Sequence, residues 1–207
     1  MNKMDKNIDK LENIEEAHKL FSKIDDLLCK DRVIIAIEGG SASGKTTLAE
    51  ILKKQYACNV FHMDDFFLRP EQRTPQRLSE IGGNVDRERF EKEVVSSLKN
   101  NEAVCYRAFD CSKQCLGEEI KVLPNKITVV EGVYSMHPSL GRYYDFSLFL
   151  DIDAEYQKKR ILMRNSPQLA TRFFNEWIPL ENKYFLATDI KKRVDRVIDV
   201  KNLIYRN

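Results

Sequence analysis

One short stretch reads Gly39-Gly40-Ser41-Ala42-Ser43-Gly44-Lys45-Thr46-Thr47 and directly follows an apolar run, Val33 to Ile37. This order predicts a strand, a loop and a helix. Gly39, Gly44, Lys45 and Thr46 fit the pattern G-x-x-x-x-G-K-[ST], in which glycines let backbone N–H groups turn toward phosphate oxygens. A helix that begins at Lys45 adds the positive end of its dipole. We therefore predict that residues 39–47 bind the phosphates of a nucleotide.

Two side chains of this loop carry chemistry of their own. The Lys45 ammonium is expected to reach the β- and γ-phosphates of ATP, and the Thr46 hydroxyl is expected to bind Mg²⁺. The alternative is a Gly/Ser-rich turn between a strand and a helix. The predicted strand and helix stand where a phosphate loop requires them, which favours the nucleotide site.

Composition and charge restrict the class of protein. The 207 residues fit one domain, and 43% hydrophobic with 32% charged residues is typical of a soluble globular chain. A net charge of +2, with acidic and basic residues interspersed, gives no reason to expect a nucleic-acid partner. Five cysteines without paired C-x-x-C spacing predict neither a disulfide framework nor a zinc site. Without an apolar run near ~18 residues or a signal peptide, we expect no membrane partner and a cytoplasmic location.

Apolar periodicity divides the chain into alternating strands and helices. We expect strands at 33–37, 58–63, 126–130, 146–150 and 193–200, and helices at 46–57, 86–98, 154–164 and 169–189, the last interrupted or kinked at Pro179. A loop is expected between 68 and 84. The aromatic residues around Trp177 are more typical of a core than of a base-stacking platform. Such alternation predicts a three-layer α/β/α fold with a parallel sheet.

Two further segments stand outside this alternation. The first 30 residues predict an amphipathic helix packed on the domain, with a partner-binding helix as the alternative. Residues 102–123 contain two short β-prone runs and predict a hairpin.

Three motifs, taken together and in order, resemble one family. GGSASGKTT at 39–47, MDDFF at 63–67 and VVEGVY at 129–134 look like the uridine kinase and phosphoribulokinase group of phosphate-loop kinases, which also holds nicotinamide riboside and pantothenate kinases. The similarity runs from about Val33 to Val200. It implies one kinase domain over 1–207, with the hairpin at 102–123 on the acceptor side and a helical lid at 160–175.

Carboxylates at the ends of two predicted strands are the catalytic candidates. Transfer of a phosphoryl group to an alcohol needs a carboxylate that orients the hydroxyl and accepts its proton. The resemblance gives this role to Asp64 and a supporting, substrate-side role to Asp65. Glu131 is expected to help Asp64 or to hold a water on Mg²⁺. The alternatives are turn or capping acids.

The remaining candidates surround the nucleotide and the acceptor. Arg160, Arg164 and Arg172 are expected to close over the phosphates and exclude water, with a solvated basic helix face as the alternative. The acceptor pocket is predicted from Asp86, Tyr106, Phe109, Asp110 and His137; for His137 a surface position is the alternative. Asp86 resembles the carboxylate that binds ribose hydroxyls.

The sequence departs from the uridine kinase pattern in two places. The hairpin reads YRAFDC at 106–111 and lacks the usual His, and the predicted lid has fewer arginines. The run DDFF followed by Pro70 and Glu71 is nearer the riboside kinase form. We expect a kinase for a nucleoside or similar riboside, uridine or cytidine first, then nicotinamide riboside or pantothenate. A regulatory ATPase is the alternative from another class, and the resemblance allows a homo-oligomer.

Overall fold

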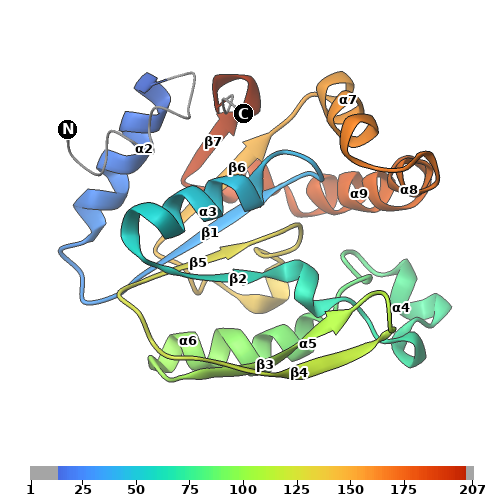
Figure 1. The fold of residues 1–207 in the computed structure, drawn as a ribbon, viewed down its shortest axis with the longest axis horizontal. Helices are drawn as coiled ribbons and strands as arrows, with labels where there is room; N and C mark the ends of the chain where they lie inside the picture. The colour runs from blue at the N-terminus through green and yellow to red at the C-terminus, as the bar shows by residue number, and fades with distance from the viewer. Residues whose placement is uncertain (1–13, 204–207) are drawn as a thin grey trace.

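The computed structural model describes residues 14–203 and has a five-stranded parallel sheet at its centre (Figure 1). The strands follow the order β2-β5-β1-β6-β7. Their bounds are Val33–Gly39 for β1, Asn59–His62 for β2, Ile127–Glu131 for β5, Phe146–Asp151 for β6 and Arg196–Asp199 for β7. The predicted parallel sheet is confirmed, although β7 is shorter than the strand predicted over 193–200.

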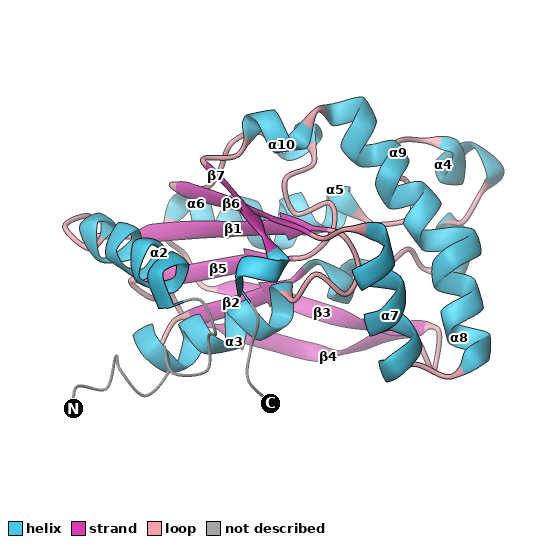
Figure 2. Ribbon diagram, turned by 90° about the horizontal axis from the view of Figure 1, so that it is seen from above, coloured by secondary structure: helices cyan, strands magenta, loops and turns pink. Residues whose placement is uncertain are grey.

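Successive residues of β1 point to opposite faces of the sheet, as strand geometry requires. Val33, Ile35 and Ile37 pack with α2 (Ile14–Leu27) and α3 (Lys45–Tyr56). Ile34 and Ala36 pack on the other face, against the helical run made of α5 (Arg87–Phe90), a π-helical turn (Glu91–Val95) and α6 (Ser96–Asn100). Figure 2 shows helices on both sides of the strands. The predicted three-layer α/β/α architecture is therefore confirmed.

A hairpin of β3 (Val104–Asp110) and β4 (Cys115–Val122) forms a second, antiparallel sheet on the β2 side of the molecule (Figure 2). Tyr106 turns inward, where its ring lies edge-on to Phe61 of β2 at 5.8 Å between centroids. The predicted hairpin is confirmed, with longer strands than the sequence indicated.

Three helices follow β6 and reach back toward the phosphate loop. They are α7 (Ala154–Arg164), α8 (Pro167–Arg172) and α9 (Ile178–Thr188), with a π-helical turn over Phe173–Trp177 between α8 and α9. Pro179 lies two residues after the π-helical turn, inside a helical run that continues from α8 into α9, so its missing N–H removes one helical hydrogen bond there. The interruption or kink predicted at Pro179 adjoins this π-helical turn. Trp177 is only half-buried, whereas Tyr184 is fully buried, so the aromatic helix is core only in its second half.

The segment expected to be a loop at 68–84 contains two short helices, a 3₁₀ turn (Pro70–Gln72) and α4 (Pro75–Ser79). The reason is local. The Thr74 hydroxyl accepts the Arg77 N–H, and Pro75 stands in the first turn, where proline favours helix.

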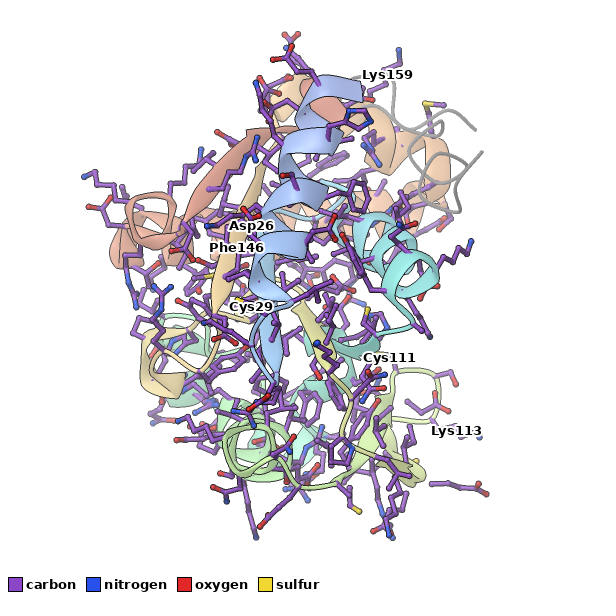
Figure 3. The ribbon with its side chains drawn as sticks, turned by 90° about the vertical axis from the view of Figure 1, so that its left-hand side faces the viewer. Asp26, Cys29, Cys111, Lys113, Phe146 and Lys159 are labelled. Carbon is purple, nitrogen blue, oxygen red and sulfur yellow. The ribbon has the colours of Figure 1, made fainter. Side chains whose placement is uncertain are left out.

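Three short 3₁₀ turns and one short helix complete the described chain: Met63–Phe66, Pro138–Leu140, Val200–Leu203 and α10 (Ile190–Arg193). The predicted N-terminal helix is present as α2, and its expected start lies outside the described residues. Within residues 14–203 no helix is long and apolar enough to cross a membrane. A shallow groove beside α2 is lined by Asp26 and Phe146 (Figure 3). Because Phe146 begins β6, this groove lies at the end of the sheet opposite the phosphate loop.

Candidate active site

The phosphate loop follows β1 without a break, and its backbone needs glycine at two points. Gly39 and Gly44 have φ values of +144° and +100°. A Cβ atom on Gly39 would also lie 2.6 Å from the Leu150 carbonyl oxygen of neighbouring β6, so no larger residue fits. Ala42 has a φ of +61°, and its methyl group packs against Ile161 and Ala170.

Lys45 folds back over the loop that it follows. Its Nζ donates hydrogen bonds to the carbonyl oxygens of Gly39 at 2.9 Å and Gly40 at 3.0 Å. The side chain is buried, so the positive charge is held at a fixed point in the loop. The contact of Lys45 with the β- and γ-phosphates stays a prediction.

Thr46, Glu131 and His62 form a hydrogen-bonded row across three elements. The Thr46 hydroxyl donates to Glu131 Oε1 at 3.0 Å, and the same oxygen lies 2.6 Å from His62 Nδ1. The sheet places them together, because Glu131 pairs with Ile37 of β1 on one side and with His62 of β2 on the other.

The hydrogen-bonded row shifts the pKa values of His62 and Glu131 in opposite directions. The hydrogen bond to Glu131 raises the pKa of His62. Burial acts to raise the pKa of Glu131, but the bond from His62 and the charges of Lys45 and His62 outweigh burial and lower it. Glu131 is therefore held as a carboxylate. His62 belongs to the site although the sequence analysis did not single it out.

Asp64 and Asp65 lie in the 3₁₀ turn that follows β2. The Asp64 side chain is open to solvent, yet enough protein surrounds it to desolvate the carboxylate and raise its pKa, with Lys45 acting in the other direction. Because the side chain is exposed, a ligand can reach this carboxylate. Asp65 is more enclosed and accepts a hydrogen bond from the Tyr106 hydroxyl at 3.2 Å, which ties this turn to the hairpin.

The donor set fits Mg²⁺ held jointly with phosphates. Mg²⁺ prefers oxygen ligands and usually takes one or two carboxylates, with substrate phosphates and waters completing its shell. The Thr46 hydroxyl, the ionised Glu131 and the open Asp64 supply such oxygens around Lys45. Over residues 14–203 no group of three or more His, Cys, Asp or Glu side chains is arranged to hold a metal by itself. A metal shared with phosphates needs no such group.

The predicted acceptor residues fall into two groups. Tyr106 faces the site through Asp65, and buried Phe109 lies on the same strand with the Arg73 guanidinium 5.6 Å from its ring centroid. Asp110 instead shapes the hairpin turn, accepting the backbone N–H groups of Ser112 at 2.8 Å and Lys113 at 3.1 Å.

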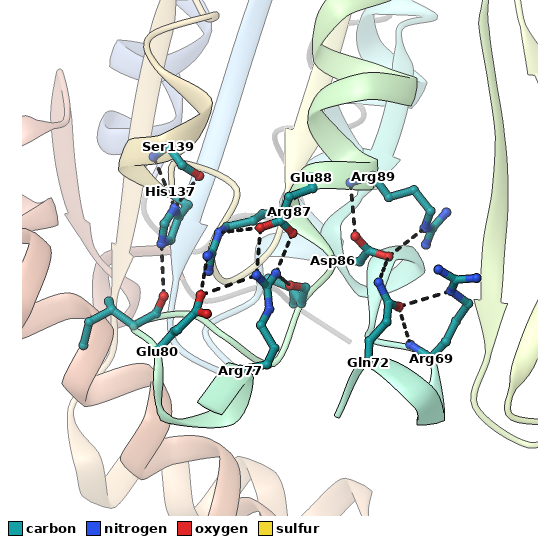
Figure 4. Close-up of polar contacts among 12 residues, drawn as sticks. Arg69, Gln72, Arg77, Glu80, Asp86, Arg87, Glu88, Arg89, His137 and Ser139 are labelled. Atoms are coloured by element: carbon teal, nitrogen blue, oxygen red, sulfur yellow. Dashed lines mark hydrogen bonds and ion pairs between the residues drawn. The ribbon is translucent and has the colours of Figure 1, made fainter. Parts of the chain in front are cut away.

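Asp86 and His137, both predicted acceptor residues, tie neighbouring segments of the chain together (Figure 4). Asp86 caps α5 through the Arg89 N–H at 3.1 Å and accepts a second bond from Gln72 Nε2 at 2.8 Å. His137 Nδ1 accepts the Ser139 N–H at 3.2 Å, which leaves Nε2 to donate to the Ile81 carbonyl oxygen at 3.1 Å.

Within residues 14–203, the three predicted lid arginines each lie over an aromatic ring, and none makes a hydrogen bond or ion pair with the phosphate loop. Arg160 lies over Tyr156, Arg164 over Phe173, and Arg172 over Trp177. Arg172 also pairs with Glu176 at 3.1 Å. Their role toward the phosphates stays a prediction.

Three residues that contact the loop carried no signal in the sequence. Glu38 ends the apolar part of β1 and is fully buried; Gln157 lies on α7 and Glu181 on α9. None belongs to a recognisable motif; Glu38 directly precedes the loop, whereas Gln157 and Glu181 reach it only through the tertiary fold. Burial raises the pKa of Glu38 to about 7, although the N–H groups of Gly39 and Met136 and the Tyr184 hydroxyl all donate to its carboxyl group.

Known proteins resemble this chain in sequence and in fold. The sequence model of the "Phosphoribulokinase / Uridine kinase family" matches residues 34–168. A uridine kinase of Chlamydia pneumoniae is 27% identical over 186 residues, covering 80% of this chain and 81% of its own. A uridine kinase of Staphylococcus haemolyticus is 26% identical and covers 80% of this chain and 86% of its own.

A solved structure described as "a Possible Uridine Kinase from Bacillus stearothermophilus" superposes with a TM-score of 0.64 at 22% identity. It covers 87% of this chain and 100% of its own. At this identity the likeness supports the fold alone.

Proposed function

The chain belongs to the phosphoribulokinase / uridine kinase family, whose members are phosphotransferases that act on an alcohol group, and we propose that it transfers the γ-phosphoryl group of ATP to a hydroxyl of a nucleoside or similar riboside. Uridine and cytidine come first among acceptors, because the named relatives are uridine kinases. Nicotinamide riboside and pantothenate follow, since the hairpin lacks the His of the uridine kinase pattern.

One observation carries the proposal. Asp64, a carboxylate open to solvent with a raised pKa, lies beside Lys45 and the Thr46–Glu131 pair. A general base must have a pKa that favours proton uptake and must be reachable by the acceptor. Lys45 supplies the adjacent positive charge that offsets charge on the transferring oxygens.

The roles follow from this arrangement. Asp64 orients the acceptor hydroxyl and takes its proton, while Lys45 and the backbone N–H groups of residues 39–47 hold the phosphates. Thr46 and the ionised Glu131 would hold Mg²⁺, which supplies charge neutralisation on the β- and γ-oxygens when bound. His62 keeps Glu131 ionised and oriented through its 2.6 Å hydrogen bond. Residues 160–175 close over the nucleotide as a lid and residues 102–123 line the acceptor.

The test is ADP production with Mg²⁺-ATP across a panel of nucleosides, nicotinamide riboside, pantothenate and phosphorylated sugars. It is run with the wild-type chain, Asp64→Asn and the matched control Asp31→Asn, which changes an exposed Asp before β1. We expect strong stimulation by one acceptor, retained in the control and lost in Asp64→Asn by about 10²–10⁴-fold. Equal, acceptor-independent ATP hydrolysis in all three proteins would refute the proposal and favour a regulatory ATPase.

A further inference from the structure

Three hydrogen bonds with side chains distant in the sequence hold Ser41 of the phosphate loop. Its backbone N–H donates to Glu181 Oε2 at 2.8 Å, and its hydroxyl donates to Glu181 Oε1. Its carbonyl oxygen accepts a hydrogen bond from Gln157 Nε2 at 2.8 Å. All three polar groups of one loop residue are therefore satisfied by α7 and α9.

These two helices stand on either side of the predicted lid at 160–175. Gln157 comes before the segment, on α7, and Glu181 comes after it, on α9. The apolar contact of Ala42 with Ile161 and Ala170 lies next to the same bonds along the loop. The chain on both sides of the predicted lid thus binds Ser41, and two residues within the lid pack against Ala42.

Burial of the Glu181 carboxylate costs free energy, because it removes the charged group from water. It is 4% exposed, and burial raises its pKa although Ser41 and the charge of Lys45 both favour the ionised form. A buried carboxylate is tolerated only when hydrogen bonds satisfy it. Both Glu181 oxygens bond to Ser41, so Ser41 is the reason that this carboxylate can be buried beside the loop.

We propose that Glu181 is a positioning residue which, together with Gln157, clamps Ser41 and so sets the geometry of the phosphate loop for nucleotide. Ser41 directly precedes the left-handed turn at Ala42, and the direction of the N–H groups that follow depends on that turn. A misplacement of about 1 Å in such a site costs on the order of 10²-fold. The inference rests on the proposed function in one respect, which is that residues 39–47 bind ATP.

A double-mutant cycle on Ser41 and Glu181 tests the clamp. The dissociation constant of Mg²⁺-ATP is measured by calorimetry for the wild type, Ser41→Ala, Glu181→Ala and the double variant, with thermal unfolding of each. Because Glu181→Ala removes two bonds to a charged acceptor, we expect its affinity to fall on the order of tenfold or more. Ser41→Ala keeps the backbone N–H that bonds to Glu181, so its loss of Mg²⁺-ATP affinity should be smaller. Adding Ser41→Ala to Glu181→Ala should cost nothing further, since the partner is already gone.

Two more variants separate positioning from general stability. Glu181→Gln keeps the shape and an oxygen for the Ser41 N–H, so it should recover part of the lost affinity. Glu91→Ala removes an exposed Glu from the helical run on the other face of the sheet and should leave Mg²⁺-ATP affinity unchanged.

The outcomes are distinct. A wild-type chain that does not bind Mg²⁺-ATP refutes the proposed function itself. Normal wild-type binding, with Glu181→Ala within about twofold of it, refutes the clamp alone. Fully additive effects of the two substitutions also refute it. Tighter binding by Glu181→Ala or Glu181→Gln would refute the clamp as well, because it would mean that the carboxylate opposes the phosphates.

Discussion

The phosphate loop and the acceptor-side segment, residues 68–90, are held in place by different kinds of contact. In the loop the bonds go to backbone groups: Lys45 binds the carbonyl oxygens of Gly39 and Gly40, and Glu181 and Gln157 bind the N–H and carbonyl groups of Ser41. In the acceptor-side segment many of the bonds join charged side chains to one another. Arg77 pairs with Glu88 at 2.6 Å, and Arg87 pairs with Glu80 (Figure 4).

On the proposed function, this difference would separate the chemistry of phosphoryl transfer from the choice of acceptor. The loop depends on backbone geometry that few sequences allow, as the crowded position of Gly39 shows. The acceptor-side segment depends on side-chain pairs, many of which can be exchanged for others with little cost. One phosphate-binding apparatus can therefore serve different acceptors. Four substitutions test how separate the two regions are.

The largest effect is expected from Lys45→Met. Loss of the fixed charge should lower kcat/KM by about 10³-fold or more, since it acts on the transferring oxygens. Acceptor binding, measured separately by calorimetry, should stay as in the wild type. Lys53→Met, which removes an exposed lysine of the same helix, is the control. A comparable loss of acceptor affinity in Lys45→Met would contradict the separation of the two regions.

Glu38→Gln should change the pH dependence of stability. Burial raises the folded pKa of Glu38 from 4.5 to about 7. The stabilisation linked to this group is therefore fully present below the unfolded pKa and is lost as pH rises through about 7. Glu38→Gln does not lose this stabilisation. Between acid and alkaline pH, the free energy of unfolding of the wild type should therefore fall relative to that of the variant by up to about 3 kcal/mol.

Urea unfolding of Glu38→Gln and the wild type between weakly acid and weakly alkaline pH measures the shift. Parallel curves for the two proteins would show that Glu38 does not titrate in this range. A matched change in residues 68–90, Glu80→Gln, should leave the pH dependence in this range near that of the wild type, because the hydrogen bond from Arg87 lowers the pKa of Glu80 and it stays ionised throughout.

Asp86→Ala should disturb the acceptor side and spare the phosphate loop. The substitution removes the cap of α5 and the partner of Gln72, which costs about 1–2 kcal/mol of stability. It should also raise the KM of the acceptor more than that of ATP. Asp153→Ala removes a comparable cap from α7 and is the control for stability alone. An equal rise in both KM values would contradict the expectation.

The smallest effect is expected from Glu88→Gln. Glu88 is largely exposed, and the hydrogen bond from Arg77 lowers its pKa. Exposed ion pairs are worth less than about 1 kcal/mol and are screened by salt. Denaturant unfolding should show a small loss at low ionic strength that disappears in high salt. A loss that persists in high salt would mean that the pair is a rigid part of the acceptor side.

Sequence patterns predicted the layers and the phosphate loop because both depend on neighbouring residues. The apolar run of β1 and the spacing from Gly39 to Thr46 can be read directly along the sequence. The pairing of Glu131 with His62 is not, because it depends on β2 and β5 being neighbours in the sheet. The same holds for Glu181, which meets Ser41 across 140 positions.

The helices at 68–84 were missed for a different reason. Proline and polar residues suggested a loop there, but Thr74 followed by Pro75 is itself a helix start. The helix start at Thr74 and Pro75 therefore decided the local structure, in spite of a composition typical of loops.

The π-helical turn over Phe173–Trp177 divides one helix into two angular settings. Since each residue advances an α-helix by about 100°, the wider turn offsets every later side chain around the axis relative to those before it. Across this wider turn Arg172 reaches the ring of Trp177, five residues further on. The turn takes up one extra residue, so an insertion or deletion within it can be absorbed, whereas deleting a residue between Ile178 and Glu181 would rotate the Glu181 carboxylate by about 100° away from Ser41.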